Sequence, residues 1–124
     1  MPRVLVVEDS PVMRGLIGSL VDELGEIEVV EVENGLEALR VLPIERFDLI
    51  ITDINMPNIN GLELLSFIRN NPQHVDTPVL VVTTEGAARD REKGLALGAT
   101  DYLVKPFENE VLIETVRRLL QEKE

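Results

Sequence analysis

Five side chains that could bind a cation and handle a phosphoryl group lie next to short apolar segments of the sequence. Glu8 and Asp9 follow the first segment, Asp53 the third, Thr83 ends the fourth, and Lys105 follows the fifth. Converging carboxylates repel one another unless protons or a cation neutralise them. Mg²⁺ prefers such oxygen ligands, keeps several waters and accepts a phosphoryl oxygen. The single histidine and the absence of cysteine disfavour zinc.

Asp53 is the best candidate for a nucleophile in this group. It follows the central apolar segment and opens a turn, so we expect it to lie in the middle of the cluster. A carboxylate can attack a phosphoryl donor while a metal ion, the Lys105 ammonium and the Thr83 hydroxyl take up the charge on the phosphoryl oxygens. Glu8 and Asp9 are then predicted metal ligands.

Taken singly, each of these residues has an ordinary structural explanation. Asp9 or Ser10 would cap a helix that begins near Pro11. Asp53 is common in turns, and most lysines such as Lys105 are surface residues. The prediction therefore rests on the conjunction of acid pair, acid, hydroxyl and amine at the ends of four segments.

The elements that must position these side chains follow from the apolar pattern. Five aliphatic runs of strand length alternate with stretches that have helical apolar spacing. Apolar strands separated by helices predict a parallel sheet covered on both faces, a doubly wound (βα)₅ three-layer sandwich. Ligands bind at the carboxyl ends of such strands. The predicted strands are 4–7, 29–32, 49–51, 79–82 and 102–104.

The predicted helices differ in how well they are anchored. One carries apolar residues from Val12 to Leu24, others begin near Asn34 and Gly61, and the last spans 112–120. The segment 85–98 is charged and has few apolar residues, so we predict that it is the most mobile helix. Residues 121–124 are predicted to be a frayed end or the start of a linker.

Length and composition narrow the class of protein. The 124 residues fit one domain, 1–124. A net charge of −11 disfavours direct binding to nucleic acid or anionic membranes. No signal peptide or membrane span fits the sequence, and we expect a cytoplasmic protein. The chain could also be one domain of a longer protein.

Along essentially its whole length the sequence resembles the receiver domains of two-component response regulators. The resemblance implies a flavodoxin-like strand order 2-1-3-4-5 and a switch controlled by phosphorylation. It is carried by Val7–Ser10, Thr52–Pro57, Gly61, Val82–Glu85, Gly98–Ala99 and Tyr102–Phe107.

The resemblance also implies roles for the site residues. Asp53 would accept a phosphoryl group from a histidine kinase. Glu8, Asp9, Asp53 and the backbone carbonyl of Asn55 would hold Mg²⁺, for which Mn²⁺ is a possible substitute. Lys105 would pair with Asp53 or its phosphoryl group.

A switch mechanism is implied as well. Thr83 would move toward the phosphoryl oxygen, and Tyr102 would turn inward into the space vacated. The bond between Lys105 and Pro106 would be cis. The responding surface, which would control a partner or an output domain, consists of the fourth helix, the fifth strand and the fifth helix.

Among receivers, the sequence is most similar to the stand-alone chemotaxis type, in residues 9–14 and in the pair Asn55 and Glu85. That pair favours rapid self-dephosphorylation. Thr84 is bulkier than the residue in many receivers and is expected to narrow access to the acceptor. Asp101 is shared with receivers that dimerise, so both a monomer and a phosphorylation-dependent homodimer stay open.

Four other functions compete with a stand-alone switch. The chain could be a receiver fragment of a larger regulator or hybrid kinase. An aspartate-nucleophile phosphatase or phosphotransferase would carry a second acid where Asn55 stands. A flavin- or nucleotide-binding domain would need a Gly-rich phosphate loop in place of Glu8–Pro11. A receiver that never takes phosphate is disfavoured because every expected site residue is present.

Overall fold

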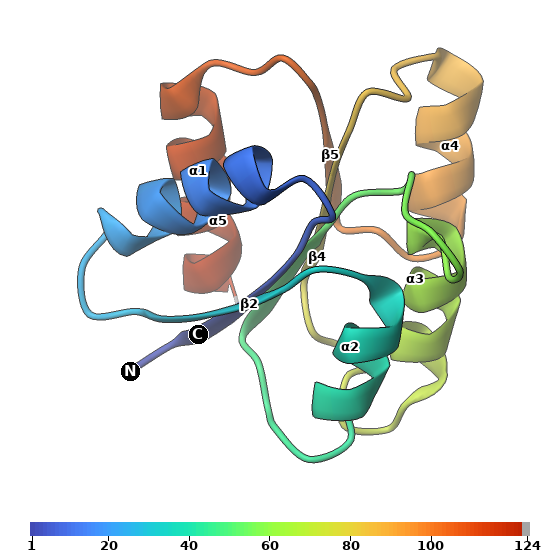
Figure 1. The fold of residues 1–124 in the computed structure, drawn as a ribbon, viewed down its shortest axis with the longest axis horizontal. Helices are drawn as coiled ribbons and strands as arrows, with labels where there is room; N and C mark the ends of the chain where they lie inside the picture. Colours follow the sequence, from blue (N-terminus) through green and yellow to red (C-terminus); the bar gives the residue numbers. More distant parts are fainter. Residues whose placement is uncertain (123–124) are drawn as a thin grey trace.

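The computed structural model describes residues 1–122, in which strands and helices alternate (Figure 1). The strands are β1 (Arg3–Val7), β2 (Glu28–Val32), β3 (Leu49–Thr52), β4 (Val79–Thr83) and β5 (Asp101–Val104). The helices are α1 (Pro11–Asp22), α2 (Gly35–Val41), α3 (Gly61–Asn70), α4 (Ala88–Ala96) and α5 (Asn109–Glu122). Residues 121 and 122 continue α5, and the rest of the predicted frayed end lies outside the described residues.

The strands form one parallel sheet in the order β2-β1-β3-β4-β5, which confirms the predicted fold class. β1 pairs with β2 and β3, and its last residue, Val7, is in register with Val32 and Thr52. Thr83 at the end of β4 is in register with Val104. The carboxyl ends of the strands therefore meet at one edge of the sheet.

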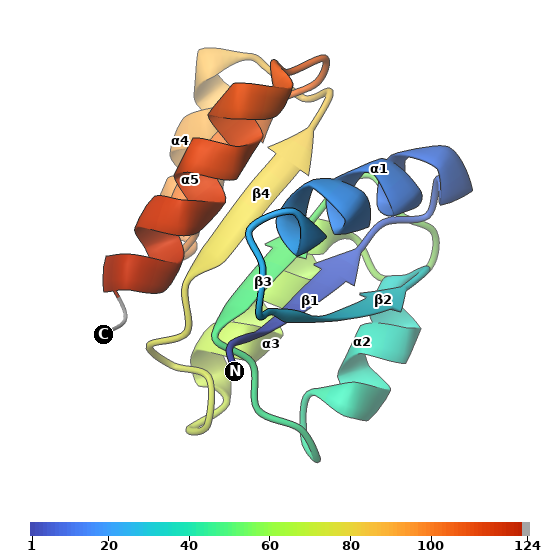
Figure 2. The same ribbon diagram turned by 90° about the vertical axis from the view of Figure 1, so that its left-hand side faces the viewer.

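Alternation along the strands builds a core on each face of the sheet. In β1, Leu5 and Val7 belong to the core beneath α2 and α3, whereas Val4 and Val6 belong to the core beneath α1 and α5. Figures 1 and 2 show α1 and α5 together on one face, with α2, α3 and α4 on the other. Every residue of β3 and β4 is buried, as expected of inner strands covered on both sides.

β2 is an edge strand and is more exposed than its neighbour β1, because no strand within residues 1–122 pairs with its outer side. Its acidic residues Glu28 and Glu31 are exposed. No helix among residues 1–122 has the length and apolar character needed to cross a membrane.

The prediction that residues 85–98 form the most weakly anchored helix is confirmed for burial. Gly94 is the one buried residue of α4. The helix starts at Ala88, later than predicted, because the preceding loop bonds elsewhere: the Glu85 N–H donates to Thr83 Oγ1, and the Tyr102 hydroxyl donates to the Glu85 carbonyl. Whether α4 is mobile stays a prediction.

Candidate functional site

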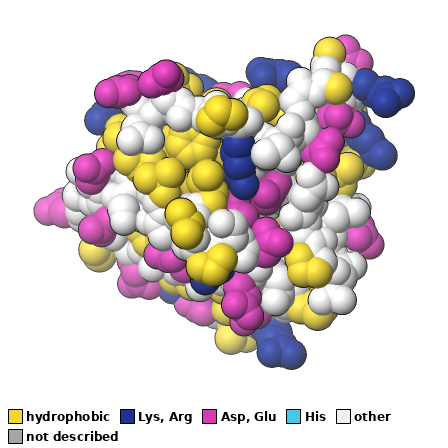
Figure 3. All heavy atoms as spheres, turned by 45° about the horizontal axis from the view of Figure 1, so that its top comes forward, with side chains coloured by type: hydrophobic (Ala, Val, Ile, Leu, Met, Phe, Trp, Pro, Cys, Tyr) yellow, Lys and Arg dark blue, Asp and Glu magenta, His cyan; other side chains and the backbone are white. Residues whose placement is uncertain are grey.

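The carboxyl ends of β1, β3, β4 and β5 bring the predicted side chains together. The backbone N–H of Asp53 donates to Val7 O at 3.2 Å, so the acidic loop after β1 lies beside the end of β3. Figure 3 tilts this face toward the viewer and shows acidic and basic side chains meeting near its middle, with hydrophobic side chains beside them. Glu8, Asp9, Asp53 and Lys105 therefore lie together, as predicted. Thr83 ends β4 at the same edge of the sheet.

Asp53 is held on both of its carboxylate oxygens and is only 7% exposed. Its Oδ1 accepts from the Ile54 N–H at 2.6 Å and from the Asn55 N–H at 3.3 Å. Its Oδ2 accepts from Lys105 Nζ at 2.9 Å. These bonds fix the direction of the carboxylate, which a nucleophile requires.

Lys105 joins the two buried acids of the site. Its ammonium also donates to Glu8 Oε1 at 2.5 Å, and Glu8 is 2% exposed. Burial lowers the pKa of Lys105, but its hydrogen bonds to Glu8 and Asp53 outweigh this, so the pKa is raised. Burial raises the pKa of Glu8, an effect that the bond from Lys105 only partly offsets. Lys105 is therefore firmly cationic at neutral pH.

The three acids also fit a hard cation. One carboxylate oxygen from each of Glu8, Asp9 and Asp53 can be chosen so that all lie within 4.8 Å of one another. Asp9 is exposed and faces solvent, which suits an ion that keeps several waters. Because Glu8 is paired with Lys105, a cation must compete with the ammonium for this carboxylate.

A second group of polar residues lies where β4 ends. The hydroxyl of the fully buried Thr83 accepts from the Glu85 N–H at 3.3 Å. Asn55 Nδ2 donates to Glu85 Oε1 at 2.7 Å, so the expected pair is formed beside Asp53. Thr84 is exposed on the same loop. The roles of these residues in phosphate chemistry stay predictions.

Tyr102 connects this loop to α4. Its side chain is fully buried, and its hydroxyl donates to the Glu85 carbonyl. Burial raises the pKa of its phenol. A Cβ at Gly94 would lie 3.2 Å from its ring, and the guanidinium of Arg91 lies 6.0 Å from the ring centre.

The expected cis bond between Lys105 and Pro106 is present.

Gly61 and Arg14 shape the site through contacts that the sequence analysis did not predict. A Cβ at Gly61 would lie 2.0 Å from Asp53 O, so only glycine lets α3 begin this close to the acceptor. The Asn60 and Glu63 capping box that fixes this helix start was visible in the sequence as N-x-x-E. Arg14 donates from Nη1 to Glu8 O at 2.8 Å, a contact that no sequence spacing signals.

Comparison with known proteins agrees with this geometry. The sequence model of one protein family, the response regulator receiver domain, matches residues 4–117. The chain belongs to the response regulator receiver family. The receiver is 40% identical to a chemotaxis protein CheY homolog of Campylobacter jejuni over 95% of this chain and 92% of that protein. The resemblance inferred from the sequence motifs is thereby confirmed.

Solved structures place the receiver among the same proteins. The chemotaxis response regulator CheY4 of Vibrio cholerae superimposes with a TM-score of 0.89 at 39% identity, covering 96% of this chain and 98% of that one. The receiver domain of the Pseudomonas aeruginosa sensor histidine kinase PA1611, solved with magnesium in its active-site cleft, gives a TM-score of 0.87 at 31% identity and covers 97% and 98%. The chain is thus a CheY-like receiver, a class of phosphorylation-dependent signalling switches.

Proposed function

We propose that this receiver accepts a phosphoryl group on Asp53 from a histidine kinase in a Mg²⁺-dependent reaction. The observation that carries the proposal is the fixed Asp53 carboxylate, which lies within hydrogen-bond distance of the Lys105 ammonium and beside the acids Glu8 and Asp9. The magnesium in the PA1611 receiver supports the choice of ion.

In the proposed transfer, a carboxylate oxygen of Asp53 attacks the phosphorus of a phosphohistidine. The new O–P bond forms as the N–P bond breaks, and its electron pair stays on the imidazole nitrogen. Lys105 remains close enough to neutralise a phosphoryl oxygen after transfer. Mg²⁺, held by Glu8, Asp9, Asp53 and the Asn55 carbonyl, would take up further charge on the phosphoryl oxygens.

Phosphorylation is proposed to act through Thr83 and Tyr102. A phosphoryl oxygen on Asp53 would offer the Thr83 hydroxyl a charged acceptor. Because the same hydroxyl accepts a hydrogen bond from the Glu85 N–H, a turn of Thr83 toward the phosphoryl group would move the loop that carries Glu85. Tyr102 binds the same loop from β5. The motion would reach the surface formed by α4, β5 and α5.

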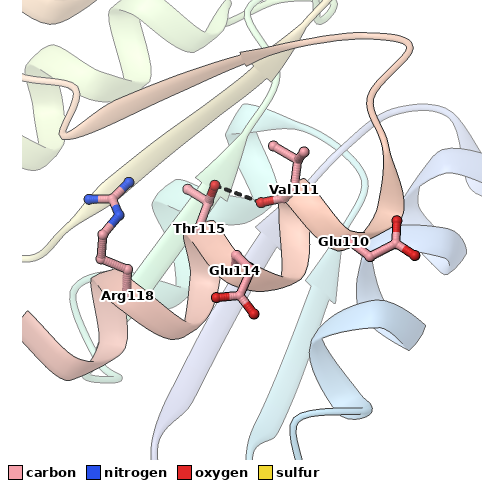
Figure 4. Close-up of a pocket in the computed structure, with 5 residues that line it drawn as sticks. All are labelled: Glu110, Val111, Glu114, Thr115 and Arg118. Atoms are coloured by element: carbon pink, nitrogen blue, oxygen red, sulfur yellow. Dashed lines mark hydrogen bonds between the residues drawn. The ribbon is translucent and has the colours of Figure 1, made fainter.

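That surface carries a shallow pocket of about 420 Å³ on α5, which Figure 4 shows in close-up. The Thr115 hydroxyl donates to Val111 O, and Arg118 is paired with Asp101 at the start of β5. None of the residues that line the pocket belongs to the Asp53 site, so it suits a partner or an output domain better than a phosphodonor.

Asn55, Glu85 and Thr84 are proposed to set the lifetime of the phosphorylated state. In self-dephosphorylation, water attacks the phosphorus, the bond to Asp53 breaks, phosphate leaves and a water proton passes to solvent. The hydrogen-bonded pair Asn55 and Glu85 would align that water, and the exposed Thr84 would restrict access to the phosphoryl group. A histidine kinase also implies a cytoplasmic setting, and both a stand-alone protein and a receiver joined to further domains remain compatible with the site.

The test is intact-protein mass spectrometry after incubation with Mg²⁺ and acetyl phosphate or phosphoramidate. We expect a labile phosphoryl adduct that needs Mg²⁺ and is lost in Asp53→Asn. Asp22→Asn, an exposed acid on α1, is the matched control and should be labelled normally. A wild-type chain that takes no adduct from either donor, or an Asp53→Asn variant that is still labelled, would refute the proposal.

A further inference from the structure

The backbone of the acidic loop after β1 is restrained at Glu8 from two sides. The Glu8 N–H donates to Val32 O on β2 at 3.2 Å, and the Glu8 carbonyl accepts from Arg14 Nη1 at 2.8 Å. Asp9, the next residue, is exposed and bears one of the three carboxylates that fit a cation. The direction of its side chain depends on how this loop is held.

Arg14 is built into α1 rather than lying freely on the surface. Its backbone N–H donates to the Ser10 carbonyl at 2.8 Å, and its side chain, 20% exposed, turns back over the loop. Its Nε lies 3.9 Å from Glu31 Oε1 on β2. One guanidinium thus joins α1, the acidic loop and β2.

Gly18 keeps Glu31 in place for this contact. A Cβ at Gly18 would lie 2.5 Å from Glu31 Oε2, so the glycine leaves the space that the carboxylate occupies. Gly18 and Arg14 are four residues apart and therefore lie on the same side of the helix. Glu31 is packed against α1 just where it can orient the guanidinium.

We propose that Arg14 is a positioning residue for the divalent cation: it fixes the Glu8 carbonyl and so holds the carboxylates of Glu8 and Asp9 at the cation site. The inference rests on the proposed Mg²⁺-dependent function and deepens it. Arg14 contacts no proposed metal-ligand side chain atom in this arrangement and acts through the backbone of the loop.

The sign of the effect separates this role from a simple charge effect. A guanidinium repels a divalent cation, so removing its charge alone would tighten Mg²⁺ binding. Releasing the loop would weaken binding, because ligands that are not held in place must be ordered when the ion binds. Positioning and charge therefore predict opposite changes in the dissociation constant.

The experiment measures Mg²⁺ binding by calorimetry and by amide shifts of residues 8–10 in nuclear magnetic resonance spectra. Arg14→Met removes the donor and keeps most of the aliphatic stem, and we expect its Kd for Mg²⁺ to rise about 10-fold or more. Arg14→Lys keeps the charge but not the planar fork, and should also bind more weakly. Arg40→Met, at an exposed position on α2, makes the same charge change elsewhere and should leave the Kd unchanged.

An unchanged or lower Kd in both Arg14→Met and Arg14→Lys would overturn the positioning role while leaving the metal site intact. If Arg14→Met fails to fold, as circular dichroism would show, Arg14→Lys alone decides the question. Absence of Mg²⁺ binding in the wild-type chain would instead refute the metal site of the proposed function.

Discussion

Two of the helices that follow functional loops, α1 and α4, are anchored very differently. α1 has a Ser10 cap that accepts from the Met13 N–H and buries four residues. α4 has no side-chain cap and buries only Gly94. Glu8 and Asp9 thus precede a firmly packed helix, whereas the loop of Thr83 and Glu85 precedes a loosely packed one. We therefore expect a rigid side around Glu8 and Asp9 and a side around α4 that moves at little cost.

Truncation of an apolar side chain should show the largest contrast. Ile17 of α1 is buried in the core, and Ile17→Ala should lower the free energy of unfolding by about 3 kcal/mol. Leu95 of α4 is 40% exposed, and Leu95→Ala should change the free energy of unfolding by no more than about 0.5 kcal/mol. Urea denaturation of both variants measures the difference, and equal losses would mean that α4 is packed as firmly as α1.

Magnesium should sharpen the contrast further. At a free concentration of 100 times its Kd, Mg²⁺ should raise the free energy of unfolding by about 2.7 kcal/mol, as for any ligand that binds only the folded state. Asp9→Asn should lose most of this gain because it removes a ligand carboxylate. Asp90→Asn makes the same chemical change on α4, and this variant should keep the stabilisation by Mg²⁺. Thermal or urea unfolding with and without Mg²⁺ tests this, and an equal loss in both variants would contradict the assigned site.

Changing the N-terminal caps of the two helices should have smaller effects on stability, in opposite directions. Ser10→Ala removes the side chain that caps α1 and should destabilise the protein by about 1 kcal/mol. Ala87 occupies the uncapped N-cap position of α4 in an extended conformation, so Ala87→Ser should stabilise that helix by about 0.5–1 kcal/mol. Hydrogen exchange of the first-turn amides reports each helix separately. Unaltered exchange in α4 of Ala87→Ser would show that its start is limited by something other than the missing cap.

Two glycines allow the smallest and most local test. An added Cβ at Gly15 of α1 meets nothing within 4 Å, so Gly15→Ala should give the full helix-propensity gain of about 1 kcal/mol. At Gly94 of α4 the Cβ would press on the Tyr102 ring, and the gain should be smaller by at least about 0.5 kcal/mol. If urea denaturation gave equal gains in the free energy of unfolding for Gly15→Ala and Gly94→Ala, α4 or the Tyr102 ring would have to move aside at no energetic cost.

Much of the fold followed from local pattern. Runs such as Val79–Val82 are apolar throughout because both faces of an inner parallel strand are covered, and this predicted the layered sheet. The Asn34 cap marked the start of α2 correctly because capping is local hydrogen bonding. The start of α4 was predicted too early, since a bond from Tyr102, 17 residues beyond Glu85, holds that segment in the loop.

By itself, the sequence determined which side chains could form the site and, through the parallel (βα)₅ pattern, that Glu8, Asp9, Asp53, Thr83 and Lys105 would share one edge. Only the tertiary structure decided how they pair: Lys105 binds Glu8 as well as Asp53, Tyr102 is fully buried, and Arg14 holds the Glu8 carbonyl. The physical reason is range. Periodicity and capping act between neighbours in the chain, whereas the bond from Lys105 to Glu8 spans 97 positions and depends on how the strands and helices pack.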